Sequence, residues 1–143
     1  MINVFHHKTN LKFSKNKTKK IILLILKEEF FFCREINVIF IDDREIKKMK
    51  KKFFQIDKIT DVISFRLNEG EKVEGEIYIS LNQTKRQAKI YNETFENEVL
   101  RLIIHGTLHL IGYDDATQKQ KDKMTKKENL YLEKFFYDNR KNI

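Results

Sequence analysis

The sequence predicts a single α/β domain in which a small mixed sheet of about four strands packs against about five helices. Three observations predict this fold class. At 143 residues, the chain has the length of one domain and can bury roughly two-thirds of its unfolded surface. Short stretches of strand character alternate with longer stretches that begin at helix-capping residues. The chain has no proline, no repeat and no low-complexity linker, so we expect residues 1–143 to form one domain.

The first part of the chain is expected to supply two strands and two helices. In order, they are a strand at residues 2–5, a helix capped by Ser14 and running to about Phe30, a strand at residues 34–41, and a short helix capped by Asp42 or Asp43 and running through Lys52. The short helix carries five lysines. Most of them are expected to face solvent, and some are candidates for RNA phosphate contacts.

The second part is expected to supply a hairpin and three helices. The hairpin consists of a strand at residues 60–65, a turn at 68–75 and a strand at 76–80. The first helix is capped by Ser80 and runs to about Ile90, and the second begins at Asn92 or Thr94. The last helix begins at the capping box Thr117-x-x-Gln120 and runs to about Tyr137. The turn predicts that its two strands pair antiparallel. Met124, Tyr131 and Phe135 form the apolar stripe of the last helix.

The helix that begins near Thr94 contains two histidines, His105 and His109. Four residues apart, they lie on one face, one turn from each other, and can reach a single ion. Gly112 is well placed to end the helix in a left-handed cap, after which Asp114 or Asp115 can offer a third ligand. Three protein ligands and one open position are typical of catalytic zinc. Spacing alone also fits satisfied core histidines, although burying two unpartnered rings side by side is costly.

The stretch from His105 to Asp115 resembles the signature of the YbeY family, His-Gly-x-Leu-His-Leu-x-Gly-Tyr-Asp-His. Members of this family are bacterial metal-dependent endoribonucleases of ribosomal RNA maturation. The resemblance implies one Zn²⁺ held by His105, His109 and Asp115, with aspartate in place of the family's third histidine. Aspartate is an ordinary zinc ligand, but the exchange makes the metal identity less certain.

Two further motifs support the resemblance. Residues 60–65 read Thr-Asp-Val-Ile-Ser-Phe, close to the family's Thr-Asp-Val-Leu-Ser-Phe, and Glu76 opens a match to Gly-Asp-Ile-x-Ile-Ser. We expect the strands to have the same order in the sheet as in this family, because hydrophobic periodicity alone does not give the order. Two positions depart from the family pattern. Phe53-Phe54 replaces a Tyr-Arg pair whose arginine is associated with RNA cleavage, and Arg66 replaces a proline and is a candidate substitute cation.

Charge and composition bear on the partner and the compartment. The net charge of +8 favours an anionic partner such as nucleic acid, although an A/T-rich genome produces a similar lysine content. The single cysteine, Cys33, fits a reducing cytoplasm. The apolar run at residues 21–26 is far too short to cross a membrane. The resemblance implies that the partners are ribosomal RNA and the small ribosomal subunit of a bacterium, and the short apolar run predicts no membrane partner.

The function that the resemblance implies is single-strand-specific, metal-dependent cleavage of ribosomal RNA near the 3′ end of 16S RNA. Gly106 occupies the place of the general-base glutamate of His-Glu-x-x-His peptidases, which argues against standard peptide hydrolysis. Arg101 is a candidate phosphate contact or a surface partner of Glu98. The remaining candidates to orient ligands or water are Asp61, Ser64 and Asp114. A metallopeptidase-like hydrolase and a non-catalytic ribosome-associated factor with a structural metal stay open as alternatives.

Overall fold

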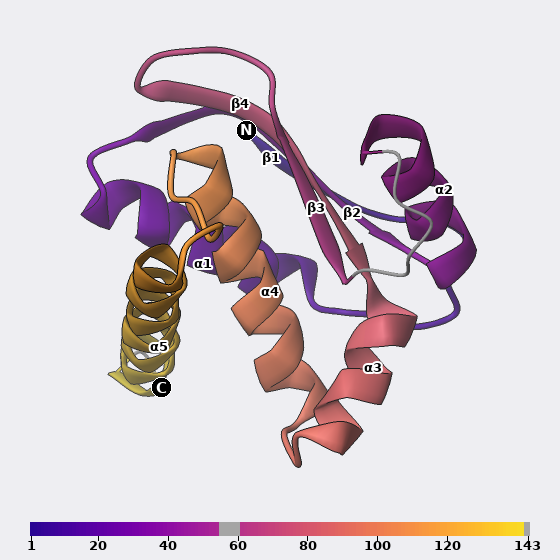
Figure 1. Cartoon of the computed structure of the whole chain (residues 1–143). Helices are drawn as coiled ribbons and strands as arrows, with labels where there is room; N and C mark the ends of the chain where they lie inside the picture. Colours follow the sequence, from indigo (N-terminus) through magenta and orange to yellow (C-terminus); the bar gives the residue numbers. More distant parts are fainter. Residues whose placement is uncertain (55–60, 142–143) are drawn as a thin grey trace.

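The computed structural model describes residues 1–54 and 61–141, which form four strands and five helices (Figure 1). The elements are β1 (Ile2–His6), α1 (Lys15–Glu28), β2 (Phe32–Ile41), α2 (Asp43–Phe54), β3 (Val62–Arg66), β4 (Lys72–Ser80), α3 (Leu81–Ile90), α4 (Phe95–Leu110) and α5 (Gln118–Lys141). The predicted α/β class is confirmed. Thr60, predicted to begin a strand, lies outside the described residues.

The strands form one mixed sheet in the order β1-β2-β4-β3. β1, β2 and β4 run parallel, whereas β3 pairs antiparallel with β4, as the hairpin prediction required. β2 and β4 begin earlier than predicted, at Phe32 and Lys72. The reason for the early start of β4 is that Val73 is fully buried and pairs with Cys33 of β2. β3 is left at one edge of the sheet.

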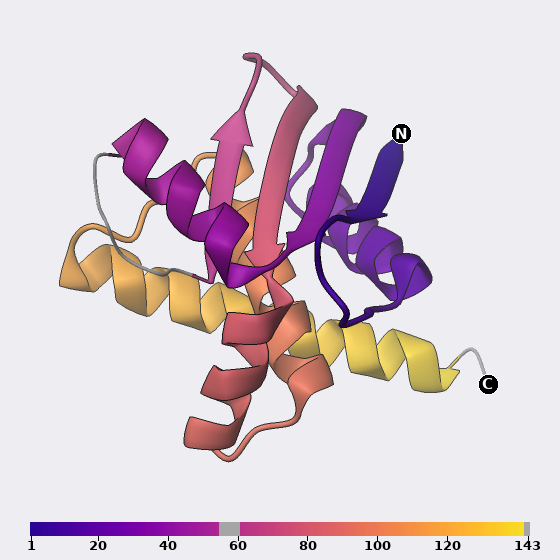
Figure 2. The same cartoon turned by 90° about the vertical axis from the view of Figure 1, so that its right-hand side faces the viewer.

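Helices cover the two faces of the sheet unequally. The large core lies between the sheet and α1, α4 and α5, and includes Ile36, Phe40 and Ile77 of the strands. The other face carries a small cluster in which Ile46 of α2 packs against Ile41 and Ile63. Figure 2 shows α2 in front of the strands and α4 and α5 behind them. No helix among the described residues has the length and apolar character to cross a bilayer.

The helix starts follow the predicted capping residues. The side chains of Ser14, Ser80 and Thr94 each accept a hydrogen bond from a backbone N–H three residues later, and Asp42, not Asp43, does so for α2. Asn92 instead ends α3 with a left-handed φ of 53°. α4 therefore begins at Thr94, the second of the two predicted starts.

The capping box of α5 also forms, because Gln120 N–H donates to Thr117 Oγ1 (3.1 Å) and Thr117 N–H donates to Gln120 Oε1 (3.0 Å). The predicted stripe of Met124, Tyr131 and Phe135 is buried in the core. A fourth residue of the same face, Glu128, is buried with them. A buried carboxylate needs partners, and those partners lie on α4.

Candidate metal centre

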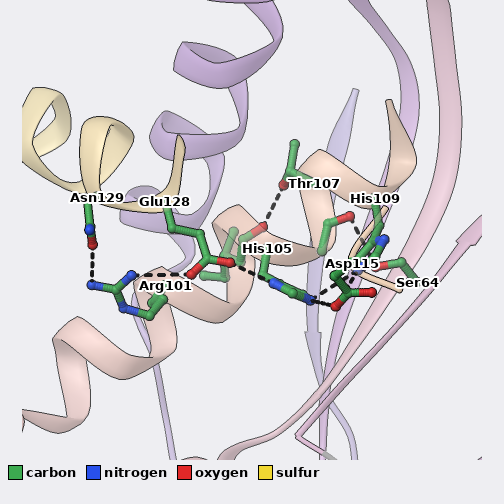
Figure 3. Close-up of polar contacts among 10 residues, drawn as sticks. Ser64, Arg101, His105, Thr107, His109, Asp115, Glu128 and Asn129 are labelled. Atoms are coloured by element: carbon green, nitrogen blue, oxygen red, sulfur yellow. Dashed lines mark hydrogen bonds and ion pairs between the residues drawn. The ribbon is translucent and has the colours of Figure 1, made fainter. Parts of the chain in front are cut away.

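Three side chains at the C-terminal end of α4 and beyond it converge (Figure 3). The Nε2 atoms of His105 and His109 are 3.1 Å apart. Asp115 Oδ2 lies 3.3 Å from Nε2 of His105 and 3.4 Å from Nε2 of His109. The helix places the two rings on one face, and the aspartate approaches from the segment that follows the helix.

The spacing and chemistry of these three atoms fit a metal ion. Ligand atoms at about 2.0–2.1 Å from a tetrahedral zinc are separated by about 3.3–3.4 Å, and the three observed separations of 3.1, 3.3 and 3.4 Å are close to that value. Two imidazole nitrogens and one carboxylate oxygen also form a common catalytic zinc donor set. The cluster of His105, His109 and Asp115 can therefore hold a divalent cation.

The turn after α4 brings Asp115 back to the histidines. Gly112 has a φ of +104°, the left-handed conformation that glycine adopts without strain. Its N–H donates to the carbonyl of His109 (3.2 Å), and the next N–H, of Tyr113, donates to the carbonyl of Leu108 (3.0 Å). These two bonds form a Schellman motif, and they confirm the left-handed cap predicted from the glycine. Of the two predicted third ligands, Asp115 faces the rings and Asp114 is exposed.

Glu128 of α5 holds the ring of His105 from the opposite side. His105 Nδ1 lies 2.7 Å from Glu128 Oε2. Because the carboxylate can only accept, Nδ1 carries the proton and Nε2 keeps its lone pair toward the cluster. Burial alone would lower the pKa of His105, but the hydrogen bond and charge of Glu128, with the charges of Asp115 and Asp61, outweigh it and raise the pKa.

Arg101 completes this chain of contacts (Figure 3). Its Nη1 donates to Glu128 Oε1 (3.2 Å), and its Nη2 donates to Asn129 Oδ1 (2.9 Å). Arg101 therefore forms its ion pair with Glu128, whereas Glu98, one of its two predicted partners, is affected only by its charge; the phosphate contact stays a prediction. The reason is that α5 packs beside α4 and brings a buried carboxylate within reach of the guanidinium. Arg101 acts on the cluster through Glu128.

Gly106 lets α4 lie directly against the sheet. A Cβ atom at this position would be 2.8 Å from Ile77 Cγ2 and 3.0 Å from Ser64 Oγ. Ser64 also donates its hydroxyl to the Gly106 carbonyl (3.1 Å), so it ties β3 to the helix. Position 106 thus faces the strands and has no room for the glutamate of a His-Glu-x-x-His peptidase.

A cavity of about 580 Å³ lies in front of the cluster, with His105, His109 and Asp115 in its wall. Asp61 and Ser64 line it too, so both predicted residues are at the site. Arg66 also lines it, but its guanidinium donates to the carbonyls of Leu110 (2.8 Å) and Gly70 (2.6 Å) and to Asn68 Oδ1 (2.9 Å). These bonds fix the end of α4 against the hairpin.

A second carboxylate, half-buried Glu29, joins the end of α1 to α5 and to Tyr113 in the segment after α4. Tyr113 and Tyr131 donate their hydroxyls to it, and Lys127 Nζ donates at 2.9 Å. Burial by itself would raise the pKa of Glu29, but these three hydrogen bonds and the charge of Lys127 together lower it. Burial and Glu29 raise the pKa of Tyr131 far above its ordinary value. Neither Glu29 nor Glu128 was identified from the sequence.

Comparison with known proteins places this architecture in a family. The family model described as Endoribonuclease YbeY matches residues 3–136. The Endoribonuclease YbeY of Chloroherpeton thalassium is 45% identical over 125 residues, covering 87% of this chain and 89% of its own. That of Karelsulcia muelleri is 34% identical over 132 residues, covering 92% and 94%.

A solved structure agrees with these relatives. The solution structure of TM1509 from Thermotoga maritima superposes with a TM-score of 0.71 at 36% identity, over 99% of this chain and 93% of that chain. The family predicted from the three motifs is thus confirmed by matches that run along almost the whole chain. This chain belongs to the YbeY endoribonuclease family.

Proposed function

We propose that this protein is a metal-dependent endoribonuclease that cleaves single-stranded RNA. Its substrate is the precursor of the small-subunit ribosomal RNA near its 3′ end, encountered on the small ribosomal subunit in a bacterial cytoplasm. The observation that carries the metal dependence is the His105, His109 and Asp115 cluster, whose spacing fits a tetrahedral ion at the wall of a cavity. Membership of an endoribonuclease family and the net charge of +8 support RNA as the substrate.

Each residue at the site has a distinct part in this proposal. His105, His109 and Asp115 hold Zn²⁺, which when bound lowers the pKa of a water molecule and stabilises charge on a phosphoryl oxygen. Glu128 keeps His105 in the tautomer whose Nε2 can ligate. Asp61 lines the cavity and is placed to orient a water molecule or accept its proton.

The peptidase alternative is disfavoured by the packing at Gly106. In His-Glu-x-x-His peptidases, the general base follows the first histidine. Here that position faces Ile77 and Ser64 and cannot carry a base. Purified protein should therefore cleave a single-stranded RNA substrate and leave casein intact, with an RNase inhibitor control to exclude a contaminating nuclease.

The test of the proposal is a comparison of three variants. His109→Ala and Asp115→Ala should each remove bound zinc, measured by elemental analysis, and RNA cleavage together. Asp114→Ala is the matched control, because it removes a neighbouring exposed carboxylate, and it should keep about one zinc per chain. Cleavage that survives His109→Ala would contradict the proposal.

The structural-metal alternative gives a different result in the same experiment. If the ion only stabilised the fold, a chelator would unfold the protein, and zinc-loaded protein would cleave no RNA. We expect instead that chelation abolishes cleavage while the circular dichroism spectrum keeps its helical signal. The large core between the sheet and α1, α4 and α5 includes none of the three proposed ligands and supports a stable metal-free fold.

A further inference from the structure

Two hollows of the surface meet at the candidate metal centre. The cavity of about 580 Å³ and a second hollow of about 360 Å³ share four lining residues, Asp61, Val62, His105 and Asp115. Beyond these shared residues their walls differ, because the first extends toward the end of α2 and the second toward the end of α3. A polymer lying across the cluster would therefore occupy both hollows, one on each side of the reacting bond.

Each hollow has an exposed aromatic side chain in its wall. Phe54, the last residue of α2, is 45% exposed and lines the first hollow. Tyr91, the C-cap of α3, is 71% exposed and lines the second. Single exposed aromatic residues are ordinary. Two exposed aromatic residues at opposite ends of one site can bind a single-stranded nucleic acid, because any base can stack on the face of an aromatic ring.

The ring of Phe54 is supported and lies near a cation, and the hollow that Tyr91 lines also has a cation in its wall. The ring of Phe54 is nearly parallel to that of Phe65, with centroids 6.1 Å apart, so the neighbouring ring backs it. Lys50 Nζ lies 5.0 Å from the centroid of Phe54, and Lys50 also lines the hollow. The backbone of Tyr91 is fixed by its N–H bond to the Gln87 carbonyl (3.0 Å), and Arg101 lines the same hollow. A ring with a neighbouring cation suits a base and its phosphate.

We propose that Phe54 and Tyr91 are base-stacking platforms that grip one nucleotide on each side of the cleaved phosphodiester. This inference rests on the proposed RNA cleavage. A base takes the face of Phe54 that Lys50 now covers, and the lysine ammonium moves to the adjacent phosphate. Stacking on a protein ring requires an unpaired base, whereas the bases of a duplex stack on each other. The two platforms therefore account for a preference for single strands.

The first experiment measures cleavage of a short single-stranded RNA, labelled with a fluorophore and a quencher, by zinc-loaded protein. Phe54→Ala and Tyr91→Ala should each raise KM by about 5- to 150-fold, the range of one lost base stack. Because stacking binds ground state and transition state alike, kcat should change by less than about 3-fold. Phe54→Trp and Tyr91→Phe, which keep an aromatic face, should retain KM near the wild-type value.

The chain offers a matched control for each variant. Phe53 is 54% exposed and packs on the same Phe65 ring with centroids 5.3 Å apart, but it is not among the described residues that line either hollow. Tyr137 is 59% exposed at the far end of α5. Phe53→Ala and Tyr137→Ala should leave KM unchanged. KM values for Phe54→Ala and Tyr91→Ala equal to those of their controls would overturn the inference.

A second measurement separates stacking from a general disturbance of the site. A series of RNAs carries one abasic nucleotide at successive positions. For wild-type protein, KM should rise when the abasic nucleotide occupies one particular position on each side of the cleaved bond. Phe54→Ala should remove the sensitivity at one of these positions and Tyr91→Ala at the other, as in a double-mutant cycle. If KM still rises at both abasic positions in both variants, the stacking inference is contradicted, but the proposed RNA cleavage is not. Wild-type protein that cleaves no RNA would instead overturn the proposed function, and this inference with it.

Discussion

Glu29 is the C-cap of α1 and Glu128 lies within α5, yet both carboxylates lie on the apolar side of a helix and have different partners. Each continues the apolar face of its helix, and their side chains are 12% and 10% exposed. Glu29 accepts hydrogen bonds from two phenols and an ammonium group. Glu128 accepts from a histidine of the candidate metal centre and from Arg101.

The difference between the two glutamates shows that the partners of a buried carboxylate, and not its burial, decide its role. Glu29 joins α1, α5 and the segment after α4, so removing it should loosen the fold. Glu128 keeps the proton of His105 on Nδ1, which leaves Nε2 free to bind metal. Removing Glu128 should therefore weaken metal binding more than it destabilises the fold. Measuring both quantities on both variants tests the distinction.

The largest expected effect is on stability. Glu29→Ala should lower the free energy of unfolding by about 3 kcal/mol, because two hydroxyls and Lys127 lose their buried acceptor. The melting temperature should fall by about 10 °C, and zinc affinity at 25 °C by less than about 3-fold. Glu28→Ala is the control, since it breaks only a surface pair with Lys134. Equal losses of unfolding free energy in Glu29→Ala and Glu28→Ala would show that the contacts of Glu29 do not stabilise the fold more than a surface ion pair does.

The second effect is on the metal. Glu128→Ala should weaken zinc binding by about 10- to 100-fold in a chelator competition, the range for losing the carboxylate behind a ligating histidine. Glu128→Gln, whose amide oxygen can still accept from Nδ1, should lie between Ala and wild type. Glu133→Ala, on the exposed side of the same helix, should bind zinc normally. An unchanged zinc affinity in Glu128→Ala would contradict a role of Glu128 in metal binding that Glu29 does not share.

A smaller change isolates one bond of the Glu29 cluster. Tyr131→Phe keeps the ring of a side chain that is 1% exposed and removes only the hydroxyl that donates to Glu29. We expect a loss of about 1.5 kcal/mol in urea unfolding, typical of a hydrogen bond to a charged group. Tyr137→Phe, at an exposed position, should show no loss, and a similar loss there would point to a nonspecific effect.

The smallest effect is a pH dependence. The folded-state pKa of Glu29 lies below its ordinary value of 4.5, so ionised Glu29 stabilises the fold above that pH. This stabilisation is lost as the pH falls through the lower folded-state pKa. The difference in unfolding free energy between wild type and Glu29→Gln should therefore be constant near neutrality and shrink below pH 4.5. A difference that stays constant down to pH 3 would contradict the lowered pKa.

The features predicted from the sequence depend on residues close together along the chain. Thr94, Ser80 and the Thr117 capping box act within one helical turn, so local pattern is sufficient to predict them. The placement of His105, His109 and Asp115 within reach of one another follows from one helix and one glycine turn. These predictions needed no knowledge of how helices pack.

The features that were missed depend on contacts between distant helices. Glu128 is 23 residues from His105, and only the packing of α5 on α4 joins them. A signal was nevertheless present in the sequence. Position 128 falls on the same face as Met124, Tyr131 and Phe135, and a glutamate in an apolar stripe requires a buried partner. Glu29 follows Ile25 in the same way on α1.

The contact at Gly106 restricts how this scaffold can acquire new chemistry. Even a methyl group there would meet Ile77 and Ser64, so α4 could accept a side chain only by withdrawing from the strands, and both histidines would move with it. An added acid or base cannot therefore be placed at position 106, next to the first histidine. Descendants or engineered versions of this domain must gain new reacting groups from the opposite wall, along β3, or from the molecule being cut.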